Sequence, residues 1–131
     1  MRRIENIYAP TEEDILAWAF SPEKKWPAED WDFYVLVPHN DRLVLKLAND
    51  PACPQQEFFL HALYYFVGST FNRPVVSEER MARIQQLLAM VDGSASAGVV
   101  QWKENVRKLM AAELKFDTEM WLHYMFQEPQ Q

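Results

Sequence analysis

Residues 58–67 form the most apolar stretch of the chain, and this stretch limits the folds that the sequence can adopt. Only His61 and the hydroxyl groups of Tyr64 and Tyr65 interrupt its hydrophobic surface. As a helix it is apolar on almost every side, and such a helix is stable in water only when other elements surround it. We therefore expect residues 54–67 to form a buried central helix, with Pro54 in its first turn and Gly68 at its end.

The rest of the sequence shows helices of ordinary amphipathic pattern. Residues 11–14, Thr-Glu-Glu-Asp, are a capping box with acidic side chains at the positive end of the helix dipole, so a helix begins there. Apolar residues recur at three- and four-residue spacing over 81–91, after a capping Ser77, and again over 99–114. Asn40 is suited to cap another helix, which contains Leu43, Val44, Leu47 and Ala48 on one face.

Residues 29–37 fit two secondary structures. Trp31, Phe33 and Val35 alternate as in a strand, whereas Trp31, Tyr34 and Val35 share one face of a helix, and the run is too short for periodicity to decide. We favour a helix because the chain offers no second convincing strand to pair with this one. The predicted fold is therefore all-α, a single helical domain over residues 1–131 with about six helices around the central one.

Charge and composition exclude several classes of function. The net charge is −6, and residues 1–65, with 11 acidic and 6 basic side chains, carry −5 of it. Nucleic-acid binding requires a basic surface, so we expect no nucleic-acid partner and consider a basic protein partner a better fit. No membrane span or signal peptide is expected, since the longest near-apolar run is about half the length of a membrane span. The single Cys53 cannot form an internal disulfide, which fits the cytoplasm.

No catalytic motif is found in the sequence, whether a serine nucleophile motif, a phosphate-binding glycine loop or a cysteine pair. Cys53 falls near the start of the central helix, where the helix dipole would lower its pKa, but no nearby histidine is implied. Glu57 with His61, and Glu119 with His123, place a carboxylate and an imidazole one helical turn apart. Two such pairs in contact could hold a metal ion, or each histidine could simply bond its glutamate. Because the further ligands of known helical metal sites are missing, we expect no metal and no cofactor.

Aromatic and acidic residues gather in the first quarter of the chain. Trp26 and Trp31 flank Pro27 to Asp30 and are surrounded by charge. Aromatic side chains beside acids are common at protein interfaces, and equally common where a loop packs on its own core. The predicted partner-binding residues are Glu12, Glu13, Asp14, Trp26, Glu29, Asp30, Trp31 and Asp32.

The run from Asp50 to Phe71, together with Asp30-Trp31-Asp32, resembles a small helical family of bacterial immunity proteins from toxin–immunity pairs. The resemblance covers about a third of the chain and is carried by Cys53-Pro54, Phe58-Phe59-Leu60, Leu63-Tyr64 and Val67-Gly68. The chain departs from the family at Gln55-Gln56, where basic residues would be expected. The resemblance implies an all-α cytoplasmic protein that binds and blocks a cognate toxin, and it transfers no catalytic residue.

We therefore expect a non-catalytic, protein-binding inhibitor, an immunity protein that neutralises a basic toxin by binding it. A structural or regulatory helical homo-oligomer, such as a homodimer, is an alternative because the abundant aromatic residues could cover a subunit interface. A helical metal-binding enzyme is a second alternative, and it depends on the two Glu–His pairs alone.

Overall fold

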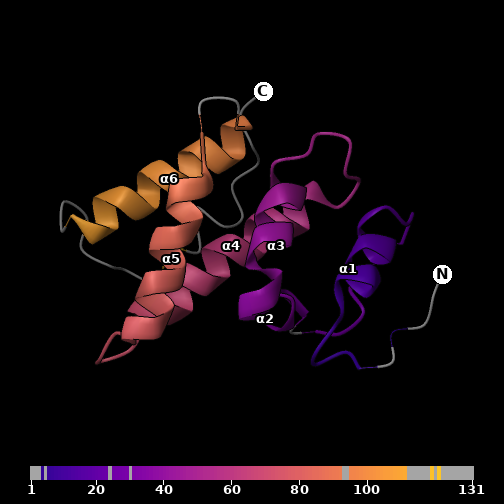
Figure 1. Cartoon of the computed structure of the whole chain (residues 1–131), viewed down its shortest axis with the longest axis horizontal. Coiled ribbons are helices and arrows are strands. Elements are labelled where there is room, and N and C mark those ends of the chain that lie inside the picture. Colours follow the sequence, from indigo (N-terminus) through magenta and orange to yellow (C-terminus); the bar gives the residue numbers. More distant parts are fainter. Residues whose placement is uncertain are drawn as a thin grey trace.

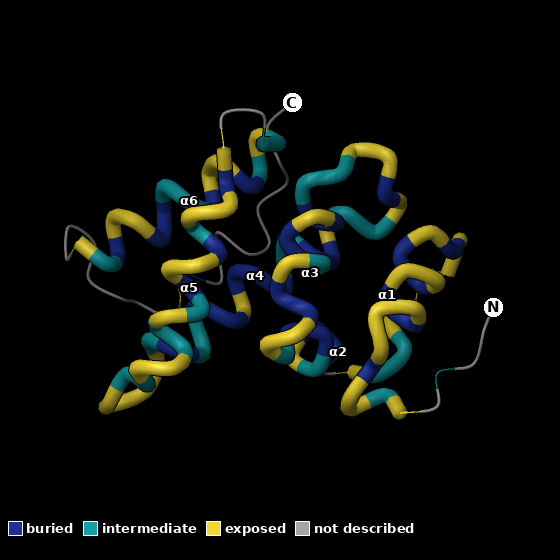
Figure 2. The backbone as a smooth tube through the Cα atoms, viewed as in Figure 1, coloured by how far each residue is buried: buried dark blue, intermediate teal, exposed yellow. Residues whose placement is uncertain are grey.

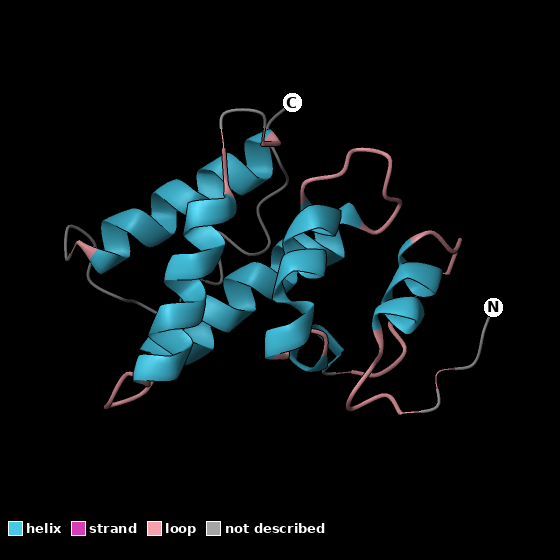
Figure 3. Ribbon diagram, viewed as in Figure 1, coloured by secondary structure: helices cyan, strands magenta, loops and turns pink. Residues whose placement is uncertain are grey.

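Six α-helices and no strand make up the part of the chain that the structure describes (Figure 3). The computed structural model describes residues 4, 6–23, 25–29, 31–92, 95–111, 119 and 121. The helices are α1 (Glu12–Ala19), α2 (Trp31–Tyr34), α3 (Asp41–Ala48), α4 (Gln56–Phe71), α5 (Glu78–Met90) and α6 (Ala97–Met110), and a 3-10 turn, η1 (Pro38–Asn40), precedes α3. The all-α prediction is confirmed, and so is the choice of a helix over a strand within residues 29–37.

The longest helix, α4, lies at the centre of the fold and contacts α2, α3, α5 and α6. In Figure 1, α1 stands at one end of the molecule and α5 and α6 at the other, with α3 and α4 between them. Figure 2 shows buried segments, in dark blue, at the position of α4. Its buried residues are Phe58, Phe59, Ala62, Leu63, Tyr64, Phe66, Val67 and Thr70. The prediction that this segment forms the buried centre is therefore confirmed.

One stripe of α4 is less deeply buried than the rest of the helix. Glu57, His61, Tyr65 and Ser69 follow one another at four-residue spacing, and none of them is classed as buried. At this spacing the side chains lie one above the other on the same helix face. We call these four residues the open stripe, and they include His61, Ser69 and the exposed ring of Tyr65.

The starts of α1 and α5 follow the capping pattern of the sequence. Thr11 accepts a hydrogen bond from the Asp14 amide at 3.1 Å, and Asp14 accepts one from the Thr11 amide at 3.2 Å, which completes the predicted capping box. Ser77 caps α5 as predicted. Asn40 occupies the N-cap position of α3, but its side chain donates to the Pro10 carbonyl at 3.2 Å. The predicted position of Asn40 at the start of α3 is therefore confirmed, but its side chain does not cap the helix and instead joins two segments of the chain.

Gly68 does not end the central helix, and this prediction is also wrong. The helix begins at Gln56 rather than at Pro54 and continues through Gly68 to Phe71. A Cβ atom at Gly68 would lie 2.7 Å from Cδ1 of Trp121, whose indole nitrogen donates to the Tyr64 carbonyl at 2.8 Å. The glycine is needed because the tryptophan ring packs directly on the helix backbone.

An aromatic cluster joins α1, α2 and α4. The ring centroid of Trp18 lies 5.0 Å from that of Trp31, 4.7 Å from that of Phe58 and 6.0 Å from that of Phe59, all in edge-to-face geometry. Aromatic pairs in this geometry add about 0.5–1.5 kcal/mol each beyond their burial. The cluster fixes α2, a helix of only four residues, against the core.

Replacing Leu63 with alanine is expected to lower the free energy of unfolding by about 2–5 kcal/mol, because Leu63 is fully buried in α4. Chemical denaturation followed by far-UV circular dichroism measures this change. Leu16→Ala on α1 is the matched control, since Leu16 is exposed and its truncation should cost much less. A cost below about 1 kcal/mol for Leu63→Ala would contradict the central position of α4.

Replacing Gly68 with alanine is expected to destabilise the protein by about 1–3 kcal/mol, because the new methyl group would overlap the Trp121 ring. In a Trp121→Ala background the same change should become neutral or stabilising by up to about 1 kcal/mol, since alanine is the better helix former. Thermal unfolding of the original chain, the two single variants and the double variant tests this change of sign. Equal effects in both backgrounds would show that the glycine has another role.

Candidate functional site

The structure divides the predicted acidic surface between the interior and the exterior. Trp31 is fully buried in the aromatic cluster, and Asp14 and Asp32 are buried as well. Glu12, Glu13, Trp26 and Glu29 are exposed, whereas Asp30 lies outside the described residues. Trp31 and Asp32 thus have structural roles here, which leaves Trp26 as the accessible aromatic side chain of the predicted set.

The carboxylate of Asp32 pairs with a histidine of the same chain. Its carboxylate lies 3.1 Å from Nε2 of His61 on the open stripe, and this pair links α2 to α4. Trp26 packs over the pair, with its ring centroid 5.5 Å from that of His61 and 4.8 Å from that of Phe58. Trp26 is nevertheless 38% exposed, so one side of its indole faces solvent.

Cys53 and His61, two of the candidate chemical groups of the sequence, have separate partners in the described part of the chain. His61 contacts Asp32 of α2, and His123 lies outside the described residues. Within the described ranges, no group of three or more histidine, cysteine, aspartate or glutamate side chains is arranged to hold a metal ion. Burial raises the pKa of the Cys53 thiol, which donates to the Ala19 carbonyl at 3.5 Å. This direction is opposite to the one predicted from the helix dipole, because the effect of burial exceeds the lowering effect of the hydrogen bond with the Gln55 backbone.

A groove of about 560 Å³ lies between α2, α4 and α5. We call it the aromatic groove. Its volume falls in the range of ordinary ligand-binding sites. The residues that line it are Tyr8, Asp32, Phe33, Tyr34, Leu36, Val37, Pro38, Tyr65, Phe66, Arg73, Ser77, Glu79, Arg80 and Arg83.

Four rings of the groove form a continuous chain of edge-to-face contacts. The ring centroids of Tyr8 and Tyr34 lie 4.9 Å apart, those of Tyr34 and Phe33 5.6 Å apart, and those of Phe33 and Tyr65 6.2 Å apart. Tyr8 is 67% exposed, Phe33 45% and Tyr65 36%. Exposing such a row of aromatic side chains to water costs free energy, because their apolar surface stays hydrated. Residues of this type are enriched in protein interfaces.

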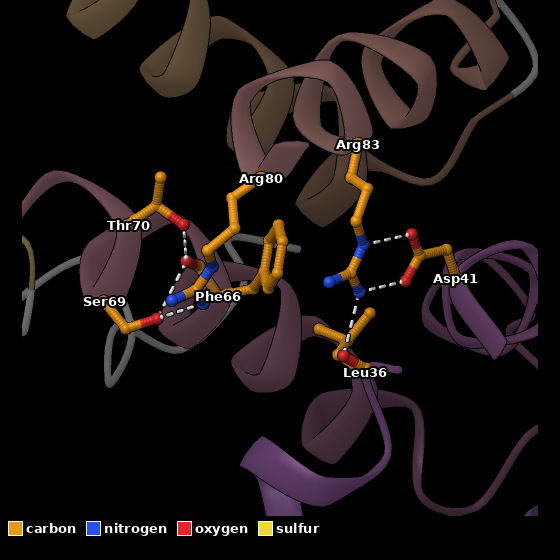
Figure 4. Close-up of polar contacts among 7 residues, drawn as sticks. All are labelled: Leu36, Asp41, Phe66, Ser69, Thr70, Arg80 and Arg83. Carbon is orange, nitrogen blue, oxygen red and sulfur yellow. Dashed lines mark hydrogen bonds and ion pairs between the residues drawn. The ribbon is translucent and has the colours of Figure 1, made fainter. Parts of the chain in front are cut away.

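Arginine side chains form the other end of the groove. Phe66 lies between two of them, with the guanidinium carbon of Arg80 4.7 Å and that of Arg83 4.4 Å from the ring centroid. Figure 4 shows one guanidinium group on each side of this ring. Arg83 is neutralised, because it donates to both carboxylate oxygens of Asp41, at 2.9 and 2.7 Å, and to the Leu36 carbonyl at 2.8 Å. This pair ties α5 to α3.

Arg80 is arranged differently from Arg83. It donates to the hydroxyl of Ser69 at 2.7 Å, and Ser69 in turn donates to the Phe66 carbonyl at 3.0 Å (Figure 4). No carboxylate among the described residues forms an ion pair with Arg80. Burial, followed by the charges of Arg73 and Arg83, lowers the pKa of Arg80 from its usual value. Asp32 and Glu79 also line the groove, but within the described part of the chain neither forms an ion pair with the Arg80 guanidinium.

Sequence reasoning did not single out the aromatic groove. The signal was present in α2, because residues two apart on a helix point to nearly opposite sides. Once Trp31 and Val35 are assigned to the core, Phe33 must face outward, and an outward phenylalanine is a candidate contact. The position of Phe33 in the same groove as Tyr65 and Arg80 depends on how α2, α4 and α5 pack. The spacing of residues within one helix does not determine that packing.

Comparison of the chain with known protein families, with curated proteins and with solved structures found no match. In the described part of the chain, no helix combines the length and the apolar character that crossing a membrane requires. The inference about function therefore depends on the groove and on the sequence itself.

Replacing Arg83 with alanine is expected to lower the free energy of unfolding by about 3–5 kcal/mol, because it leaves the buried Asp41 carboxylate without its partner. Arg83→Lys should recover only part of this loss, since lysine keeps the charge but cannot donate two parallel bonds. Arg107→Ala, which breaks an exposed pair with Glu104, is the matched control. Equal stability of the Arg83 and Arg107 variants would contradict the proposed link between α3 and α5.

Proposed function

We propose that this protein is a non-catalytic, protein-binding inhibitor of the immunity type, which neutralises a cognate toxin by covering its surface. The observation that supports the proposal best is the aromatic groove, where three exposed aromatic side chains stand beside arginines. Aromatic and arginine side chains supply most of the binding energy in protein interfaces. An inhibitor that blocks access to an active site needs no catalytic group of its own.

The acidic charge of the chain gives a second, separate contribution to binding. The net charge of −6 and the exposed Glu12, Glu13 and Glu29 would attract a basic toxin over a distance and speed the encounter. The groove and the half-exposed Trp26 would then supply desolvated contacts that slow dissociation. The two contributions are separable, because steering changes the association rate and the aromatic contacts change mainly the dissociation rate.

The proposal is tested with the protein encoded beside this one, purified and titrated against the full chain in a surface-based kinetic assay. Phe33→Ala and Tyr8→Ala should raise the dissociation rate by about tenfold or more, as truncation of an interface hot spot does. Phe20→Ala is the matched control, since Phe20 is 50% exposed and does not line the aromatic groove. The combined change of Glu12, Glu13 and Glu29 to lysine should slow association at low salt, with little effect on dissociation.

Any of three results would contradict the proposal: that the protein encoded beside this one fails to bind, that the groove and control variants dissociate at the same rate, or that the bound protein keeps its full activity. The alternative of a homo-oligomer is tested on the same samples by light scattering. A dimer that Phe33→Ala converts to monomer, while Phe20→Ala does not, would assign the groove to contacts between copies of this chain.

A further inference from the structure

We propose that the arginine end of the aromatic groove binds a carboxylate of the partner, carried by an acidic residue with an aromatic or large apolar neighbour in the partner's sequence. The inference rests on the proposed function and names the segment that the groove would recognise. The proposed carboxylate belongs to a single residue at one local contact. A toxin that is basic overall can still carry such an acidic residue.

The guanidinium group of Arg80 has unused hydrogen-bonding capacity. An arginine side chain has five N–H donors, and Arg80 uses one of them on the Ser69 hydroxyl. Arg83, one helical turn away, uses its donors on Asp41 and Leu36. Two neighbouring arginines on α5 are thus in opposite states, one neutralised within the fold and one available to a ligand.

The position of Arg80 is fixed before any ligand arrives. Its guanidinium lies over the Phe66 ring and is bonded to Ser69, whose own hydroxyl proton is committed to the Phe66 carbonyl. A side chain that is already ordered loses little conformational entropy on binding, so its contacts contribute more to affinity. Partial burial also strengthens a charged contact, because the surroundings are less polar than water. Arg73, exposed at the rim of the groove, adds a second positive charge.

The chemistry of the groove selects the kind of anion. A carboxylate accepts two parallel hydrogen bonds from one guanidinium group, which is the geometry that Arg83 and Asp41 already show in this protein. From Arg80 the floor continues through Tyr65, Phe33 and Tyr34 to Tyr8, so a chain bound by its carboxylate would lay its neighbouring side chains on rings. Nucleic acid also carries anions and flat rings, but the net charge of −6 opposes a polyanion. A single acidic residue in an apolar context fits both features.

The test is a selection of peptides on the full-length protein. A random peptide library displayed on phage is passed over immobilised protein at low salt, and the retained sequences are read. We expect enrichment of peptides with Asp or Glu beside Phe, Tyr, Trp or Leu. Synthetic copies should bind Arg80→Gln at least about tenfold more weakly than the original chain, because a charge-assisted bidentate contact is lost. Arg107→Gln on α6 removes an exposed arginine outside the groove and should leave binding unchanged.

Two further variants keep the result interpretable if Arg80→Gln unfolds. Arg73→Gln changes an exposed side chain and should weaken binding more modestly, while Arg80→Lys keeps the charge but loses the bidentate geometry. No enrichment, enriched peptides without acidic residues, or acidic peptides that bind all variants alike would each overturn the inference. So would a single-stranded RNA oligonucleotide that binds and is lost in Arg80→Gln, or a dimer that this variant dissociates.

Failure of the carboxylate contact and failure of the proposed function give different experimental results. If the protein encoded beside this one binds, and Phe33→Ala weakens the binding while Arg80→Gln does not, the inhibitor function stands and the carboxylate contact is wrong. If acidic peptides bind through Arg80 but the neighbouring protein does not, the groove is a peptide site and the immunity function is wrong.

Discussion

The inward side chains of α4 must be removed from water on several sides at once, and the rest of the fold follows from this requirement. Buried residues of α4 such as Phe59, Leu63 and Val67 stay dry only because α2, α3, α5 and α6 contact the same helix. Helices of about 10 Å diameter leave gaps where they meet around a common centre. Along the open stripe, His61 pairs with Asp32 of α2, and Tyr65 lines the aromatic groove.

Phe66 connects the hydrophobic core with the charged end of the groove. Its ring separates two like charges, which would repel each other more strongly if they were in contact. The ring face attracts each cation by its quadrupole, a contribution of about 0.5–2 kcal/mol that offsets part of the repulsion. Asp41 then neutralises only Arg83, since both of its oxygens are occupied there. The packing of α3 and α5 therefore gives the Asp41 carboxylate to Arg83, and among the described residues Arg80 forms no ion pair.

Features that depend on local chemistry could be predicted from the sequence, and those that depend on distant partners could not. Capping by Thr11 and Ser77 and the apolar spacing of the helices arise within a few residues, and the structure confirms them. Asn40 and Gly68 were misassigned because their partners, Pro10 and Trp121, are far away in the chain. The groove has the same origin, since α2, α4 and α5 each contribute only part of it.

The unequal burial of the tryptophans gives the protein an internal optical probe. Four of the five, Trp18, Trp31, Trp102 and Trp121, are at most 2% exposed, whereas Trp26 is 38% exposed. A water-soluble quencher therefore reaches a single indole, and the remaining emission comes from the interior. Because Trp26 lies against His61 and Phe58, its accessible emission would report on the joint between the loop after α1 and the central helix, while the shielded emission follows the core.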